Sequence, residues 1–129
     1  MHKTFGIIAA LYGGLAVVLG AFGAHALKNK LDAYQLDIFN KGVQYQFYHA
    51  LALIAVVLIS DKLNTKTLTI AGWNFSLGVL FFSGSLYLLA MRHLLGMEGF
   101  ASILGPITPL GGLCFIIGWI FLLISFVKM

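Results

Sequence analysis

The stretch TFGIIAALYGGLAVVLGAFGAHAL, residues 4–27, contains no Asp, Glu, Lys or Arg. A helix needs about 20 apolar residues to cross the hydrocarbon core of a bilayer, because each residue advances it by about 1.5 Å. Three further stretches meet the same condition, namely Val43–Ser60, Leu68–Met91 and Pro109–Val127. We therefore expect an all-α integral membrane protein with four spanning helices.

The composition agrees with this class. Of the 129 residues, 60% are hydrophobic and only 9% are charged, whereas a soluble domain typically carries about 25% charged residues. Four helices and their connections account for the whole length, so we predict a single transmembrane domain over residues 1–129. The lone Cys114 excludes an intrachain disulfide.

The net charge of +4 does not indicate nucleic-acid binding, because the basic residues are scattered at the ends of the apolar stretches. There they would meet lipid headgroups, so membrane lipids are the expected partners. Four basic residues fall on each side of a four-span topology: Lys3, Lys62, Lys66 and Lys128 against Lys28, Lys30, Lys41 and Arg92. The positive-inside rule therefore gives no orientation.

The expected architecture is an antiparallel up-down four-helix bundle with helices at about 4–27, 33–60, 68–91 and 109–127. The second helix has a polar, interfacial first half. Asp32 is placed to cap it, and Asp37 and Lys41 have the i,i+4 spacing of a helical ion pair. Thr108 and Pro109 have the pattern of an N-cap followed by proline at the first helical position.

Small residues indicate close helix packing, which lipid favours over contacts between large apolar side chains. The first helix carries a small-residue seam at spacings of three and four: Gly6, Ala9, Gly13, Ala16, Gly20 and Gly23. This seam packs either within the chain or between copies, and we expect a homo-oligomer. The third helix has two nearly opposite faces, Gly72, Ser76, Ser83 and Ala90 against Asn74, Gly78, Ser85 and Arg92, which predict a position surrounded by protein.

A set of polar residues is expected toward one side of the membrane: His25, Tyr45, Gln46, His49, Ser83, Ser85 and Arg92. Antiparallel neighbours would bring His49 and Ser85 to similar depth. Polar groups inside a bilayer are costly unless paired, so they mark either interhelical hydrogen bonds or a functional site.

Four interpretations of this set stay open. The side chains can bond the helices together, or His25 and His49 can ligate a haem. With Arg92, the two histidines can instead bind an anionic headgroup or a quinone. His49, Gln46 and Ser85 can also line a path for an ion or proton. No cofactor or metal is predicted.

Catalytic patterns are missing from the sequence. It has no Ser-His-Asp set, no paired carboxylates, no CxxC and no acidic residue inside a span. We therefore predict a protein that is not an enzyme and assign no catalytic residue.

Several blocks resemble the bacterial domain-of-unknown-function 423 (UPF0382) membrane family: GAFGAHAL (20–27), VQYQFYHALAL (43–53), FSGSLY (82–87), ITPLGG (107–112) and GW (118–119). The similarity extends to the eukaryotic transmembrane protein 256 group. The resemblance implies a small multi-pass protein of the bacterial plasma membrane and transfers no activity or protein partner. Our leading expectation is a membrane-organising or accessory protein; the alternative is a lipid-, quinone- or haem-binding or transport module using His25, His49 and Arg92.

Overall fold

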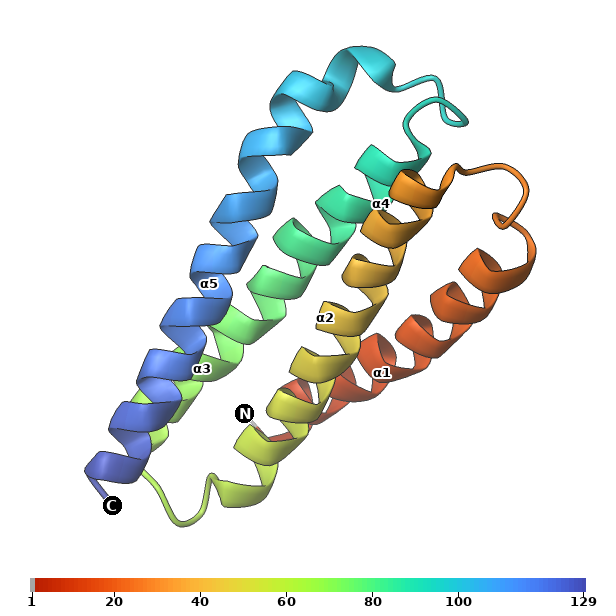
Figure 1. The fold of residues 1–129 in the computed structure, drawn as a ribbon. Coiled ribbons are helices and arrows are strands. Elements are labelled where there is room, and N and C mark those ends of the chain that lie inside the picture. The colour runs from red at the N-terminus through yellow and green to blue at the C-terminus, as the bar shows by residue number, and fades with distance from the viewer. Residues whose placement is uncertain (1) are drawn as a thin grey trace.

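The computed structural model describes residues 2–129, which form four long antiparallel helical rods (Figure 1). They are α1 (His2–His25), α2 (Ala33–Ile59), a third rod of α3 (Thr65–Gly78), η1 (Val79–Ser83) and α4 (Gly84–Met91), and α5 (Ala101–Val127) after the short η2 (Glu98–Phe100). Each rod is long and apolar enough to cross a membrane. The predicted all-α, four-span class is confirmed.

The start of α2 is as predicted. The Asp32 side chain accepts a hydrogen bond from the Gln35 amide at 2.7 Å, and the Gln35 side chain accepts one from the Asp32 amide at 3.1 Å. This reciprocal capping box satisfies two amides that the first helical turn leaves free. Lys41 Nζ lies 3.2 Å from Asp37 Oδ2.

The third rod differs from the uniform helix that the sequence predicts. It begins at Thr65, where Asn64 caps the helix by accepting a hydrogen bond from the Thr67 amide. Its middle, Val79–Ser83, is π-helical. Such segments insert one extra residue into a turn, and hydropathy does not reveal them.

The predicted start of the fourth helix at Pro109 is wrong, because α5 begins at Ala101 and contains both Pro106 and Pro109. Both prolines lie near its N-terminal end, where Figure 1 shows the rod curving. The Thr108 hydroxyl donates to the Leu104 carbonyl at 3.3 Å. A membrane helix tolerates proline because neighbouring helices, polar side chains and local adjustments can satisfy the backbone groups that the missing N–H leaves free.

The α1 seam packs against α2 within the same chain. Ala9 and Ala16 are buried. A Cβ added to Gly20 would lie 3.4 Å from Val43, and one added to Gly23 would lie 2.8 Å from the Phe39 ring. Gly20 and Gly23 therefore allow the two backbones to approach closely, and the seam from Ala9 to Gly23 is occupied inside the chain.

The two small-residue faces of the third rod contact different neighbours, as predicted. On one face, Gly72 lies against Phe5 of α1, and Ser83 donates to the Gly42 carbonyl of α2. On the other face, Gly78 lies against Phe115 of α5. The third rod is therefore flanked by protein on both sides.

Small residues of α5 complete this packing. Gly111 lies against the backbone of Phe81 and Phe82, so a side chain there would clash with main-chain atoms. Near the C-terminal end of α5, the Ser125 hydroxyl is hydrogen-bonded to the Thr67 hydroxyl of α3 at 2.6 Å in a buried position. Both contacts hold α5 against the third rod.

Candidate functional site: the intramembrane polar cluster

Gln46 is the predicted polar residue whose side chain bonds to two other helices. Its side chain is 4% exposed. Its Nε2 donates to the Tyr12 carbonyl oxygen at 2.8 Å, and the Tyr87 hydroxyl donates to its Oε1 at 2.7 Å. The Tyr12 hydroxyl in turn donates to the Ser76 carbonyl oxygen at 2.8 Å. One amide thus joins α1, α2 and α4, and Tyr12 extends the connection to α3.

Ser83 lies in the π-helical segment and is fully buried. Its hydroxyl donates to the Gly42 carbonyl oxygen at 2.7 Å. A Cβ on Gly42 would lie 2.7 Å from the Tyr87 ring. The lack of a side chain at Gly42 therefore leaves room for the tyrosine that reaches Gln46.

His49 has both ring nitrogens engaged. Its Nδ1 lies 2.7 Å from the Tyr45 carbonyl oxygen, which can only accept, so Nδ1 carries the proton. Trp119 Nε1 can only donate, and it donates to His49 Nε2 at 3.0 Å. These partners define a neutral imidazole. The ring is 4% exposed and stacks on Phe115, with centroids 3.6 Å apart.

The Tyr45 side chain is partly exposed and packs beside this histidine. Its ring centroid lies 4.8 Å from that of Phe82 and 6.3 Å from that of Phe115. Its carbonyl oxygen is the acceptor for His49. Tyr45 therefore contributes its backbone and ring to the cluster.

The predicted common depth of His49 and Ser85 is wrong. The His49 ring lies beside Phe75, with centroids 5.6 Å apart. Ser85 lies on the same rod about 15 Å from Phe75 along the axis, at about 1.5 Å per residue. It is hydrogen-bonded to Thr108 of α5 at 2.6 Å. The prediction failed because α2 starts well before the apolar span from which depth was counted.

The predicted His25–His49 pair is also not assembled. His25 is exposed at the end of α1, near Gly23, which packs on Phe39. His49 lies about 15 Å beyond Phe39 along α2, at about 1.5 Å per residue. The two histidines therefore cannot be axial ligands of one iron in this arrangement.

Arg92 stands apart from both histidines. Its Nη1 donates to the Leu89 carbonyl oxygen at 2.6 Å. The adjacent His93 accepts from Gln35 at the start of α2 at 3.2 Å, roughly 20 Å from His49 at about 1.5 Å per residue. The structure does not form the predicted His25–His49–Arg92 face.

Sequence reasoning missed the partners that complete the cluster: Tyr12, Tyr87, Thr108, Phe115 and Trp119. A signal was available for the tyrosines and the tryptophan, because a buried Tyr hydroxyl or Trp N–H usually needs a hydrogen-bond partner.

The polar interior is closed on itself. In residues 3–129, whose side chains the structure describes, no buried side-chain nitrogen or oxygen lacks a hydrogen-bond partner. The same residues contain no group of three or more His, Cys, Asp or Glu side chains placed to hold a metal ion. The Gln46 amide, the Ser83 and Ser85 hydroxyls and the His49 imidazole are each hydrogen-bonded to another part of the chain.

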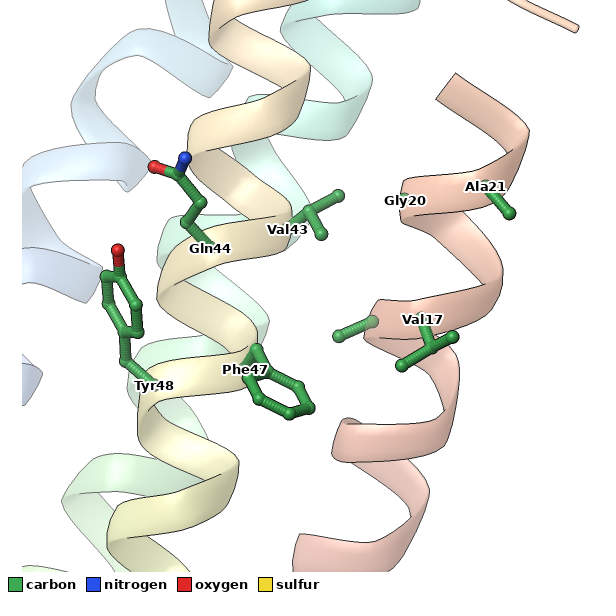
Figure 2. A pocket seen from close by; sticks show the side chains of 8 residues that line it. Val17, Gly20, Ala21, Val43, Gln44, Phe47 and Tyr48 are labelled. Carbon is green, nitrogen blue, oxygen red and sulfur yellow. The ribbon is translucent and has the colours of Figure 1, made fainter. Parts of the chain in front are cut away.

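An apolar groove of about 350 Å³ lies apart from this cluster, between α1 and α2 (Figure 2). It is lined by Ala16, Val17, Gly20, Ala21, Val43, Gln44, Phe47 and Tyr48. In Figure 2, Val43 and Phe47 extend from α2 toward α1, whereas the Gln44 and Tyr48 side chains extend away from it. The groove is open at the outer surface of two membrane-spanning helices.

Comparison with known proteins adds a family match and close relatives. The family model described as "Protein of unknown function (DUF423)" matches residues 19–112. The chain is 46% identical over 127 residues to the UPF0382 membrane protein YwdK of Bacillus subtilis (strain 168), covering 98% of each chain. It is 44% identical over 126 residues to the UPF0382 membrane protein SSP2132 of Staphylococcus saprophyticus, again covering 98% of each. No solved structure matches.

Proposed function

This chain belongs to the DUF423 family of multi-pass bacterial membrane proteins, and we propose that it acts as a non-enzymatic accessory component that organises its membrane surroundings. In this proposal the polar residues hold the helices together, and the outer surface carries the function. The relatives have membrane-protein names without an enzymatic term, which is compatible with this role.

The observation that carries the proposal is that both the nitrogen and the oxygen of the Gln46 side-chain amide are hydrogen-bonded to other helices of the chain. A transport path needs polar groups that can exchange partners with a passing ion or water. The Gln46 amide nitrogen instead donates to the Tyr12 carbonyl, and the amide oxygen accepts from the Tyr87 hydroxyl. An amide used in this way stabilises the packing of three helical segments.

His49 supports the same proposal. A ligand to haem iron must offer a free nitrogen, but Trp119 donates to Nε2 and the Tyr45 carbonyl accepts from Nδ1. Binding iron through Nε2 would break the bond to Trp119 and displace the ring from Phe115. The geometry therefore favours a structural histidine.

Flux measurements in liposomes test the proposal against the transport alternative. We expect purified protein to pass protons and potassium no faster than protein-free liposomes, with no change in Gln46→Leu or His49→Phe. A flux that the wild type supports and either variant abolishes would overturn the proposal in favour of a polar path. Gln44→Leu, at an exposed position of the same helix, is the matched control.

A further inference from the structure

The basic residues of the bundle lie in two groups, one at each end of the rods. Figure 1 shows the start of α1, the α2–α3 turn and the end of α5 together at one end (the terminal end). The α1–α2 and α4–α5 connections lie together at the opposite end (the loop end). The terminal end carries Lys3, Lys62, Lys66 and Lys128, and the loop end carries Lys28, Lys30, Lys41 and Arg92. The two ends therefore carry equal numbers of basic residues.

Lys41 lies inside α2 but still belongs to the loop end. Along the helix axis it lies about 27 Å before Ile59, the last residue of α2, at about 1.5 Å per residue. The hydrocarbon core of a bilayer is about 30 Å thick. Lys41 therefore lies near the boundary of that core, where its exposed side chain reaches the headgroups of the loop end.

The equal division is made of opposing preferences along the chain. Orientation depends on the Lys and Arg residues near the ends of the spans, and the first helix usually has the greatest weight. Around α1, Lys28 and Lys30 outnumber Lys3, which favours the loop end in the cytoplasm. Around the other rods, three basic residues of the terminal end stand against two of the loop end, which favours the opposite orientation. The chain as a whole thus supports neither orientation over the other.

Loop length and acidic residues do not override this balance. The connections 26–32, 60–64 and 92–100 are much shorter than the ~60 residues above which a loop crosses the membrane largely regardless of its charge. The acidic residues are unequally divided, with Asp32, Asp37 and Glu98 at the loop end and Asp61 at the terminal end. Acidic residues contribute little to orientation, so the basic residues decide it.

We propose that this chain inserts into the membrane in both orientations, so that each end of the bundle faces the cytoplasm in part of the population. An equal division of Lys and Arg gives neither orientation an advantage. Each copy then meets inverted as well as parallel copies in the same bilayer, and both are available as partners for the predicted homo-oligomer. The inference rests on the membrane location and the charges, not on the accessory role, so either proposal can fail without the other.

Cysteine labelling of the full-length protein in intact bacterial cells measures the proportion of each orientation. Asn29→Cys places a thiol at the loop end and Met129→Cys places one at the terminal end, both at exposed positions and without loss of a charged residue. A membrane-impermeant maleimide labels only the thiols outside the plasma membrane, and labelling after lysis gives the total. The wild-type protein, whose single cysteine is Cys114 inside α5, gives the background.

We expect roughly half of the molecules to be labelled at each position, and no less than about one fifth at either, because neither orientation is favoured. Each molecule has one end outside, so the two labelled fractions should add up to the whole population. Labelling confined to one position would overturn the proposal. Labelling of Asn29→Cys alone would show that the terminal end, which has the larger net positive charge, is always in the cytoplasm.

Removing one basic residue from either end should shift the population in opposite directions. Lys28→Gln leaves more basic residues at the terminal end, so labelling should rise in Asn29→Cys and fall in Met129→Cys. Lys66→Gln should have the reverse effect. Both lysines are exposed, so neither change disturbs the packing of the helices. We expect the ratio of the two orientations to change at least about threefold with each substitution.

Glu98→Gln is the matched control for these substitutions. Glu98 is exposed at the loop end, and its replacement changes the charge by one unit without changing the number of basic residues. We expect the ratio of the two orientations to stay within about twofold of the wild-type ratio. A larger shift would contradict the proposal, since net charge would then set the orientation. An unchanged ratio in both Lys28→Gln and Lys66→Gln would contradict it as well.

Discussion

At the scale of single residues, the interior of this protein shows how polar side chains are accommodated inside a membrane. An amide or hydroxyl in hydrocarbon costs free energy unless it has partners. Gln46 finds one in a backbone carbonyl and one in a tyrosine hydroxyl. His49 finds its partners in a carbonyl and an indole N–H. Each residue therefore favours one arrangement of its neighbours.

Replacing Gln46 with leucine should destabilise the protein. The change removes two interhelical hydrogen bonds and leaves the Tyr87 hydroxyl without its acceptor. Intramembrane hydrogen bonds average about 0.6 kcal/mol and reach about 1.7, so we expect a loss of about 1–2 kcal/mol. Reversible unfolding in mixed micelles measures it.

Gln44→Leu provides the control for this prediction, because Gln44 is exposed on the same helix. Its unfolding free energy should stay within about 0.5 kcal/mol of the wild type, as is usual for surface substitutions. If Gln46→Leu were as stable as Gln44→Leu, the hydrogen bonds of Gln46 would not be holding the helices together.

Of the seven polar residues that the sequence singles out, four are buried, whereas His25 and Tyr45 are exposed, and the sequence does not predict what the buried ones contact. Gln46, His49, Ser83 and Ser85 are all buried in the structure. Most of their partners are backbone carbonyls, which every residue has and no sequence pattern distinguishes. The separation of His25 from His49 likewise depends on helix register, which apolar spans leave undefined.

At the scale of helices, backbone proximity explains the distribution of glycine. Gly111 of α5 lies against the main chain of Phe82, whereas a Cβ on the adjacent Gly112 would meet the Phe82 ring at an ordinary 3.8 Å. A ring can move by a few tenths of an ångström, but a helix backbone cannot move without shifting the rod. The two neighbouring glycines thus have different structural roles.

Gly111→Ala and Gly112→Ala form a matched pair. We expect Gly111→Ala to destabilise the protein by about 2 kcal/mol, within the usual ~1–3 kcal/mol range for overpacking. Gly112→Ala should be neutral or stabilising by up to about 1 kcal/mol, because alanine has the higher helix propensity. Unfolding in mixed micelles measures both, and equal stabilities would contradict the close approach of α5 to η1.

Hydropathy predicts the existence of the four helices, and small-residue spacing predicts the two contact faces of the third rod. Two features escaped prediction. The π-helical segment at Val79–Ser83 depends on how the helices before and after it pack. The early start of α5 was missed because Pro106 and Pro109 usually mark a boundary, whereas here they lie inside the helix.

At the scale of the whole molecule, the α1 seam contacts α2 of the same chain. The expected homo-oligomer therefore stays a prediction and would have to use another surface. The outer face of α5 is one such surface, with Leu113, Ile116 and Leu123 exposed. The interior side chains are taken up by interhelical hydrogen bonds and small-residue contacts. The outer surface is therefore left for interactions with lipids and other proteins.

Native mass spectrometry of the wild-type protein in mild detergent tests most directly whether the polar interior serves packing rather than ligand binding. It reports the number of chains and every retained small molecule in one spectrum. We predict a homo-oligomer of whole chains in which phospholipid is the only bound small molecule. A haem or a quinone retained at one per chain would contradict this account.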